Sequence, residues 1–110
     1  MKLLEIVDKL ELEIVAGFNT DDKCAEGVYI GDLLSVVMSK AKQNHIWITI
    51  QTHINIIAVA TLVDLAGIIV VEDMEIDKDT IDKANEVGIP LIKSSLSAYQ
   101  LACKLREIGL

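Results

Sequence analysis

The sequence predicts an α/β protein, with helices on both faces of a mainly parallel sheet of about five strands. From Val28 onward, short apolar runs typical of strands alternate with stretches in which apolar residues recur at helical spacing. The run Ile68–Val71 is continuous and β-branched, as expected for a central parallel strand that is covered on both faces. A second buried run joins a helix through a short polar turn within residues 45–55, HIWITIQTHIN.

The beginning of the chain predicts a helix, two strands and a loop. Residues 2–9 place their apolar side chains on one side of a helix. Glu11–Gly17 alternates apolar and acidic residues, which is typical of a half-exposed strand. Phe18–Gly27 is the long polar segment and predicts a loop, after which Val28–Gly31 predicts a short strand.

Two strand–turn–helix units can be read in the middle of the chain. Asp32 is predicted to cap a helix over residues 32–41, because a carboxylate there can accept backbone N–H bonds, and Gly31 allows a tight turn before it. The strand at residues 46–50 is followed by a helix over residues 54–64.

The C-terminal part predicts a further helix, a strand and a last helix. The helix spans residues 78–87 and ends at Gly88, and the strand spans residues 90–93. Ser97 and Gln100 are spaced as a capping box for the last helix, which packs its apolar side inward.

The composition excludes several classes of function. With 110 residues, of which 52% are apolar, the chain forms one domain with its own core. Its net charge of −7 argues against binding to nucleic acid or anionic membranes. No apolar run approaches the roughly 18–20 residues of a membrane span, and acidic residues interrupt the place of a signal peptide's apolar region. We therefore expect a soluble, cytoplasmic protein.

The helix after the central strand predicts contact with another chain. Residues 54–63 are apolar almost all round, and in so small a domain only part of this surface can face the sheet. The remainder predicts a homodimer.

Polar residues that follow the predicted strands give a candidate ligand site. In an open α/β sheet, ligands bind beyond the carboxyl ends of strands and against helix N-termini. The neutral donors and acceptors of the turn Gln51–Asn55 suit a small ligand, such as a phosphorylated one. The alternative is that Thr52 caps the helix and His53 forms a local hydrogen bond. The candidate residues are Gly31, Asp32, Thr49, Gln51, Thr52, His53, Asn55, Ser94 and Ser95.

Motifs for catalysis and cofactors are missing from the sequence. Neither GxxxxGK[ST] nor GxGxxG occurs, and nothing indicates a metal site or a cofactor. His53 and either Ser94 or Ser95 could in principle form a Ser–His pair, but a third member is not evident. We therefore expect no catalytic residues.

Three stretches of the sequence carry a family resemblance: VYIGDLLSVVMSKAK, IWITIQTHINIIAVATLVDLAGIIVV and GIPLIKSSLSAYQLACKL. They resemble the DRTGG domain family, and the resemblance covers about residues 5–110. It implies a three-layer α/β/α sandwich like the N-terminal domain of HPr kinase/phosphorylase, a regulatory or assembly role, and frequent dimerisation. Similar domains occur in some phosphotransacetylases and between CBS domains of some inorganic pyrophosphatases. After the central strand, members of the family often carry the sequence GDR followed by Thr or Ser and then Asp. This chain has Gln51–Asn55 at that position, which resembles the stand-alone, single-domain branch of the family.

These observations together predict a non-enzymatic regulatory module, a dimer that senses a small metabolite or nucleotide and acts on a partner protein. One alternative is an interaction or assembly subunit without a ligand, whose contacts would be Phe18–Gly27 and Glu72–Asp77. The other alternative is a small hydrolase or transferase that uses His53.

Overall fold

The computed structural model describes residues 1–18 and 23–110, so residues 19–22 of the predicted loop lie outside the described part. The order of helices and strands is the one that the sequence predicts, and most boundaries differ by one or two residues. The elements are α1 (Leu3–Lys9), β1 (Glu13–Ala16), β2 (Gly27–Ile30), α2 (Leu34–Lys40), β3 (His45–Thr49), α3 (Asn55–Val63), β4 (Gly67–Val70), α4 (Lys78–Val87), β5 (Leu91–Lys93) and α5 (Ala98–Glu107).

The described strands form one five-stranded sheet in the order β1-β5-β4-β3-β2. Neighbours from β2 to β5 pair in parallel, whereas β1 is antiparallel to β5. Strand β4 lies in the middle, and all four of its residues are buried. The mainly parallel sheet and its central β-branched strand are therefore confirmed.

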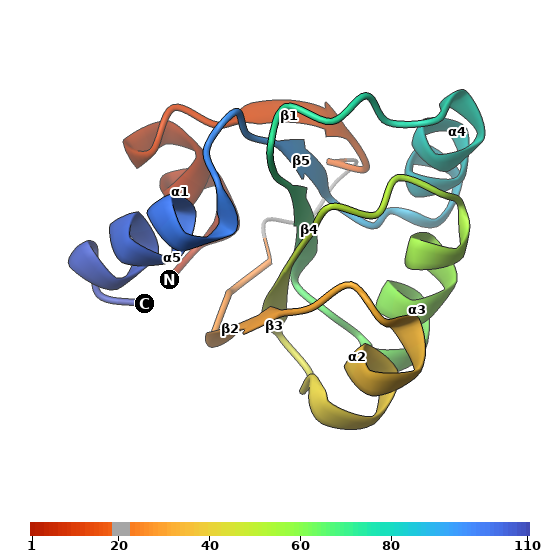
Figure 1. Cartoon of the computed structure of the whole chain (residues 1–110), viewed down its shortest axis with the longest axis horizontal. Helices are drawn as coiled ribbons and strands as arrows, with labels where there is room; N and C mark the ends of the chain where they lie inside the picture. Colours follow the sequence, from red (N-terminus) through yellow and green to blue (C-terminus); the bar gives the residue numbers. More distant parts are fainter. Residues whose placement is uncertain (19–22) are drawn as a thin grey trace.

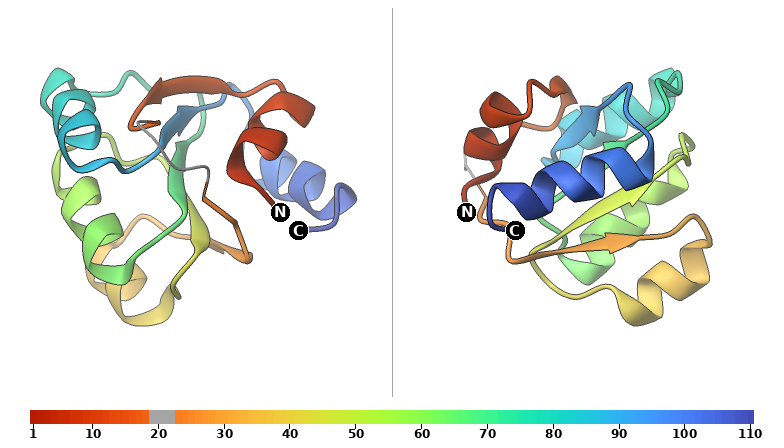
Figure 2. Two further views of the ribbon diagram at one scale, coloured as in Figure 1. Left: turned by 180° about the vertical axis from the view of Figure 1, so that it is seen from behind. Right: turned by 60° about the vertical axis from the view of Figure 1, so that its left-hand side comes forward.

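The helices cover both faces of this sheet, which makes the fold a three-layer α/β/α sandwich. Strands β2 to β5 follow one another across the sheet in sequence order, so crossovers of one hand carry their connecting helices to the same face. Helices α2, α3 and α4 accordingly lie on one face, and α1 and α5 lie together on the other (Figures 1 and 2).

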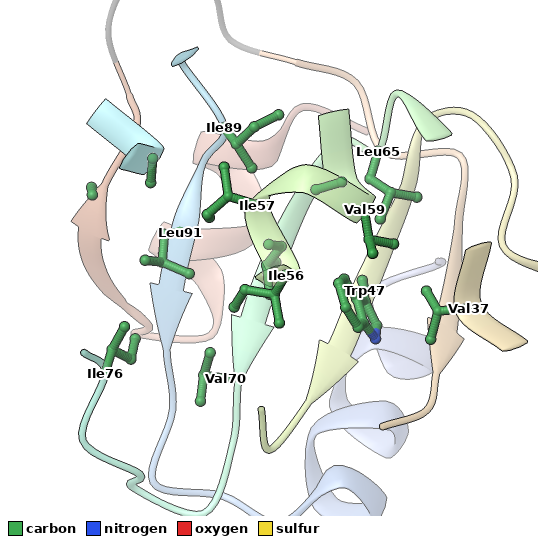
Figure 3. Close-up of a cluster of buried hydrophobic side chains, with 14 of the residues drawn as sticks. Val37, Trp47, Ile56, Ile57, Val59, Leu65, Val70, Ile76, Ile89 and Leu91 are labelled. Atoms are coloured by element: carbon green, nitrogen blue, oxygen red, sulfur yellow. The ribbon is translucent and has the colours of Figure 1, made fainter. Parts of the chain in front are cut away.

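Each face of the sheet has its own apolar core, because successive side chains of a strand point to opposite faces. Trp47 points toward α2 and α3, where it packs near Val37 and Ile56 (Figure 3). Its neighbours Ile46 and Ile48 belong to the second core, beneath α1 and α5. The Trp47 ring is fully buried, and its Nε1 donates a hydrogen bond to the Gly31 carbonyl at 2.7 Å.

Two predicted helix caps are wrong and one is confirmed. The N-cap of α2 is Leu33 and that of α3 is Ile54, and neither helix receives a side-chain capping bond from Asp32 or Thr52. The predicted capping box of α5 is present: Ser97 Oγ accepts the Gln100 N–H at 3.2 Å, and the Gln100 side chain accepts the Ser97 N–H at 3.0 Å.

Gly17 is the tightest backbone contact among the described glycines. Its φ is +82°, and a Cβ at this position would lie 1.8 Å from the Ile89 carbonyl oxygen. Its N–H donates to Asn85 Oδ1 at 2.8 Å. Only a glycine can therefore occupy position 17, where the chain leaves β1 and passes the connection between α4 and β5.

The two chain ends lie beside each other on the face covered by α1 and α5 (Figures 1 and 2). A Cβ placed on Gly109 would be 4.0 Å from Met1 Cε. Within the described residues, no helix has the length and apolar composition that a membrane span requires.

Candidate functional site

The carboxyl ends of β2 and β3 are joined by a hydrogen-bond network. Asp32 Oδ1 accepts the Thr49 hydroxyl at 2.8 Å and the Ile50 N–H at 3.0 Å. Gln51 Nε2 donates to the Asp32 carbonyl at 3.0 Å, and the Gln51 N–H donates to Thr49 Oγ1 at 3.1 Å. The structure thus brings Asp32, Thr49 and Gln51 together, next to Gly31, and hydrogen bonds link the three residues to one another.

This network explains why Asp32 does not cap α2. Its carboxylate already accepts two donors from the end of β3, so it holds two neighbouring strands together instead of binding the first turn of the helix after it. The predicted capping role is replaced by a cross-link between β2 and β3.

The turn after β3 is tied to the start of α4. His53 Nδ1 lies 2.9 Å from Asp77 Oδ2, and the His53 side chain is 72% exposed. The Thr52 carbonyl accepts the hydroxyl of the fully buried Thr80 at 2.7 Å. Thr52 therefore acts through its backbone, and His53 lies on the surface.

Asn55 lines a different feature, an apolar groove between α3 and α4 of about 610 Å³. The outer side of α3 forms one wall of this groove, and Leu62 on it is 70% exposed. We call the exposed, uncharged residues Ile54, Ala58, Thr61 and Leu62 the α3 stripe.

The connectivity of the sheet indicates where a ligand crevice is expected. Ligand crevices in open α/β sheets occur where the helices after two adjacent strands leave toward opposite faces. The helices after β2, β3 and β4 all cover the same face, whereas the helix after β5 covers the other one (Figure 1). The divergence therefore falls between β4 and β5.

A cleft of about 360 Å³ lies at this point, and we call it the β5 cleft. It contains Ser94 and Ser95 of the predicted site, together with residues that sequence reasoning missed. Those residues come from the α1–β1 connection, β1, β5, α5 and the loops after β4 and β5. The α1–β1 connection reaches the cleft because β1 pairs with β5. The lining residues are Leu10, Glu11, Leu12, Glu13, Asp73, Lys93, Ser94, Ser95, Leu96 and Lys104.

Backbone hydrogen bonds join the loops after β4 and β5 beside the cleft. The Ser94 carbonyl accepts the Asp73 N–H at 3.0 Å, and the buried Ser94 Oγ accepts the Leu96 N–H at 3.1 Å. Lys93 Nζ lies 3.5 Å from Asp73 Oδ1, and its side chain is 24% exposed. Glu72 and Asp73 have left-handed φ values of 64° and 53°, which is costly for residues with a Cβ.

The predicted site residues therefore fall into four places: the Asp32 network, the surface turn with Thr52 and His53, the α3–α4 groove with Asn55, and the β5 cleft with Ser94 and Ser95. Within residues 1–18 and 23–110, no three His, Cys, Asp or Glu side chains gather closely enough to hold a metal ion.

Comparisons with known proteins agree with this architecture. The structure is similar to that of the CBS and DRTGG domains of the regulatory region of Clostridium perfringens pyrophosphatase, solved in complex with its activator, diadenosine tetraphosphate. The TM-score is 0.71 at 17% sequence identity, so the match shows a shared fold. It covers 91% of this chain and 44% of the pyrophosphatase chain, so this chain spans less than half the length of that one.

The search of curated proteins returned no match. The family model of the DRTGG domain matches residues 5–108. Because this match covers nearly the whole sequence, the chain belongs to the DRTGG domain family.

Proposed function

We propose that this protein is a non-enzymatic regulatory module that binds a small metabolite or nucleotide and acts on a partner protein. The observation that carries the proposal is the β5 cleft, a polar hollow at the divergence of α4 and α5. The pyrophosphatase region with the same fold is regulatory and binds a nucleotide activator, which supports a ligand-responsive role here.

The arrangement of the candidate nucleophiles favours binding over catalysis. A Ser–His hydrolase needs the imidazole within hydrogen-bond reach of the hydroxyl that it activates. His53 instead contacts Asp77, and Ser94 Oγ accepts the Leu96 N–H. Among the described residues, neither Ser94 nor Ser95 forms a hydrogen bond with His53, which supports binding rather than a Ser–His mechanism.

The α3 stripe supports action as a homodimer. Its residues are exposed and carry no charge, and Ile54 and Leu62 lie about 12 Å apart along the helix axis. In a twofold dimer with antiparallel α3 helices, Leu62 of one copy meets the Ile54 end of the other, and the small Ala58 allows close approach at the centre.

Ligand binding is tested by thermal denaturation with nucleotides, phosphosugars and acyl phosphates. A ligand of the β5 cleft raises Tm, and Ser95→Tyr, which fills the cleft, abolishes the rise. Ser35→Tyr on the exposed side of α2 is the matched control and keeps the response. A response that survives Ser95→Tyr would place the ligand elsewhere.

Dimerisation is tested by sedimentation of the wild-type protein and two variants. Leu62→Lys puts a charge into the α3 stripe and yields a monomer. Tyr99→Lys alters a residue that is 78% exposed on the opposite face and leaves the dimer intact. A wild-type protein that sediments as a monomer at all concentrations would refute this part of the proposal.

The second candidate function is an assembly subunit without a ligand, which the apolar α3–α4 groove favours. Purification from the native host separates the two functions. A stable partner, together with no Tm response to any small molecule, supports the assembly subunit.

A further inference from the structure

We propose that the β5 cleft binds a zwitterion of the amino-acid class, a small molecule that carries both an ammonium and a carboxylate group. The proposal rests on the ligand-binding function above and narrows it to one chemical class. It follows from the way in which charged side chains line the cleft without neutralising one another.

The acidic wall of the cleft comes from Glu11 and Glu13, at the α1–β1 connection and in β1. Within the described residues, neither carboxylate takes part in a hydrogen bond or ion pair. Glu13 lies opposite Lys93 in the β1–β5 register, but Lys93 Nζ pairs with Asp73 instead. Two carboxylates therefore remain available to a cation in the cleft.

The basic wall comes from Lys104 of α5. Although three carboxylates line the same cleft, Lys104 has no ion pair within the described part of the chain. Opposite charges that lie in one cleft but do not reach each other can both be satisfied by a ligand that spans them. An ammonium beside Glu11 and Glu13, with a carboxylate beside Lys104, meets this requirement through charge-assisted hydrogen bonds.

The hydroxyl groups of the cleft add neutral contacts to this arrangement. Ser95 is exposed at the rim and has no side-chain hydrogen bond within the described residues. Ser94 Oγ accepts the Leu96 N–H, so its own O–H can point into the cleft. A carboxylate accepts such O–H donors, which places the carboxylate end of the ligand near Lys104 and the serines.

The charge balance disfavours a nucleotide polyphosphate in this cleft. Its lining has three carboxylates against two lysines, and one of the lysines is already paired. The whole chain carries a formal charge of −7, so a ligand with several negative charges is repelled as it approaches. A volume of about 360 Å³ is at the small end for ligand pockets, which also suits an amino acid.

The test uses the full chain and two series of probes, the proteinogenic amino acids and the nucleotides AMP and ATP. At a concentration of ten times Kd, a bound amino acid raises Tm by about 5 °C. Calorimetry then compares the affinity of the amino acid that binds with the affinities of its decarboxylated amine and its N-acetyl derivative. Each derivative lacks one of the two charges and binds at least about tenfold more weakly.

Two variants assign the charges to the two walls. Lys104→Gln removes the preference for the amino acid over its amine, and Glu11→Gln reduces the preference for the amino acid over its N-acetyl derivative. Lys78→Gln, a control on the surface of α4, changes neither preference. If both preferences survive in Lys104→Gln and Glu11→Gln, the assignment is refuted.

The outcomes separate this inference from the proposed function. A Tm rise with ATP or AMP but with no amino acid overturns the zwitterion and leaves the regulatory function standing. No rise with any amino acid, nucleotide, phosphosugar or acyl phosphate overturns both.

Discussion

The cross-link between Asp32 and Thr49 gives a quantitative test of how the ends of β2 and β3 are held together. Asp32→Ala removes the acceptor of two hydrogen bonds, of 2.8 Å from the Thr49 hydroxyl and 3.0 Å from the Ile50 N–H. Hydrogen bonds to a charged group contribute about 1.5–3 kcal/mol each, and the solvent exposure of this turn reduces that contribution. We expect Asp32→Ala to lower the free energy of unfolding by about 2 kcal/mol.

A double-mutant cycle with Thr49→Val separates the cross-link from a helix cap. Thr49 is 1% exposed, and valine keeps its shape while removing the donor. Because the bond between the two side chains can be lost only once, the double variant should cost about 1 kcal/mol less than the sum of the single variants. If Asp32 only capped α2, the two effects would add to within about 0.3–0.5 kcal/mol.

Urea denaturation followed by tryptophan fluorescence measures these differences. Trp47 is the one tryptophan of the sequence and is fully buried in β3, so its emission reports the unfolding of the central sheet. A loss of about 2 kcal/mol moves the urea midpoint by about 1 M for a domain of this size. Thr61→Val, whose hydroxyl donates within α3, is the control partner and should add to Asp32→Ala without coupling. Additivity in the Asp32–Thr49 pair would refute the cross-link.

Three further predictions concern single positions. Gly17→Ala should destabilise the fold by more than about 3 kcal/mol, because its Cβ would lie 1.8 Å from the Ile89 carbonyl oxygen. Thermal melting by circular dichroism measures the loss, and Gly31→Ala, whose Cβ would be 3.1 Å from the Tyr29 ring, should be milder. Thr80→Val should cost about 1–3 kcal/mol in urea denaturation because the Thr52 carbonyl loses its donor, whereas Thr80→Ser should retain most of the stability. Glu72→Gly should stabilise the protein by about 0.5–1 kcal/mol, since it relieves a φ of 64° at the expense of some chain entropy, and a lower Tm would contradict this reasoning.

The elements of the fold could be predicted because their signals are local. The continuous run Ile68–Val71 predicts a central strand, and β4 is buried along its whole length. Ser97 and Gln100 predict a capping box, which forms as expected because both partners lie within one turn of the same helix.

The site could be predicted only in part, because it depends on the order of the strands. Asp32 has the sequence context of a helix cap, and nothing local reveals that the end of β3 offers it two donors instead. The turn after β3 has the polar composition of a binding site, but the helices around it all leave toward one face. Glu11 and Glu13 reach the β5 cleft because β1 pairs antiparallel with β5 at the edge of the sheet, a pairing between distant segments that composition and periodicity do not encode.

The proximity of the two chain ends has a consequence for how this domain can be joined to others. Because Met1 and Gly109 nearly touch, a host protein could carry the domain as a cassette within a surface loop without stretching its own backbone. For the same reason, a short linker between the ends would permit circular permutation, with new termini opened at an exposed turn.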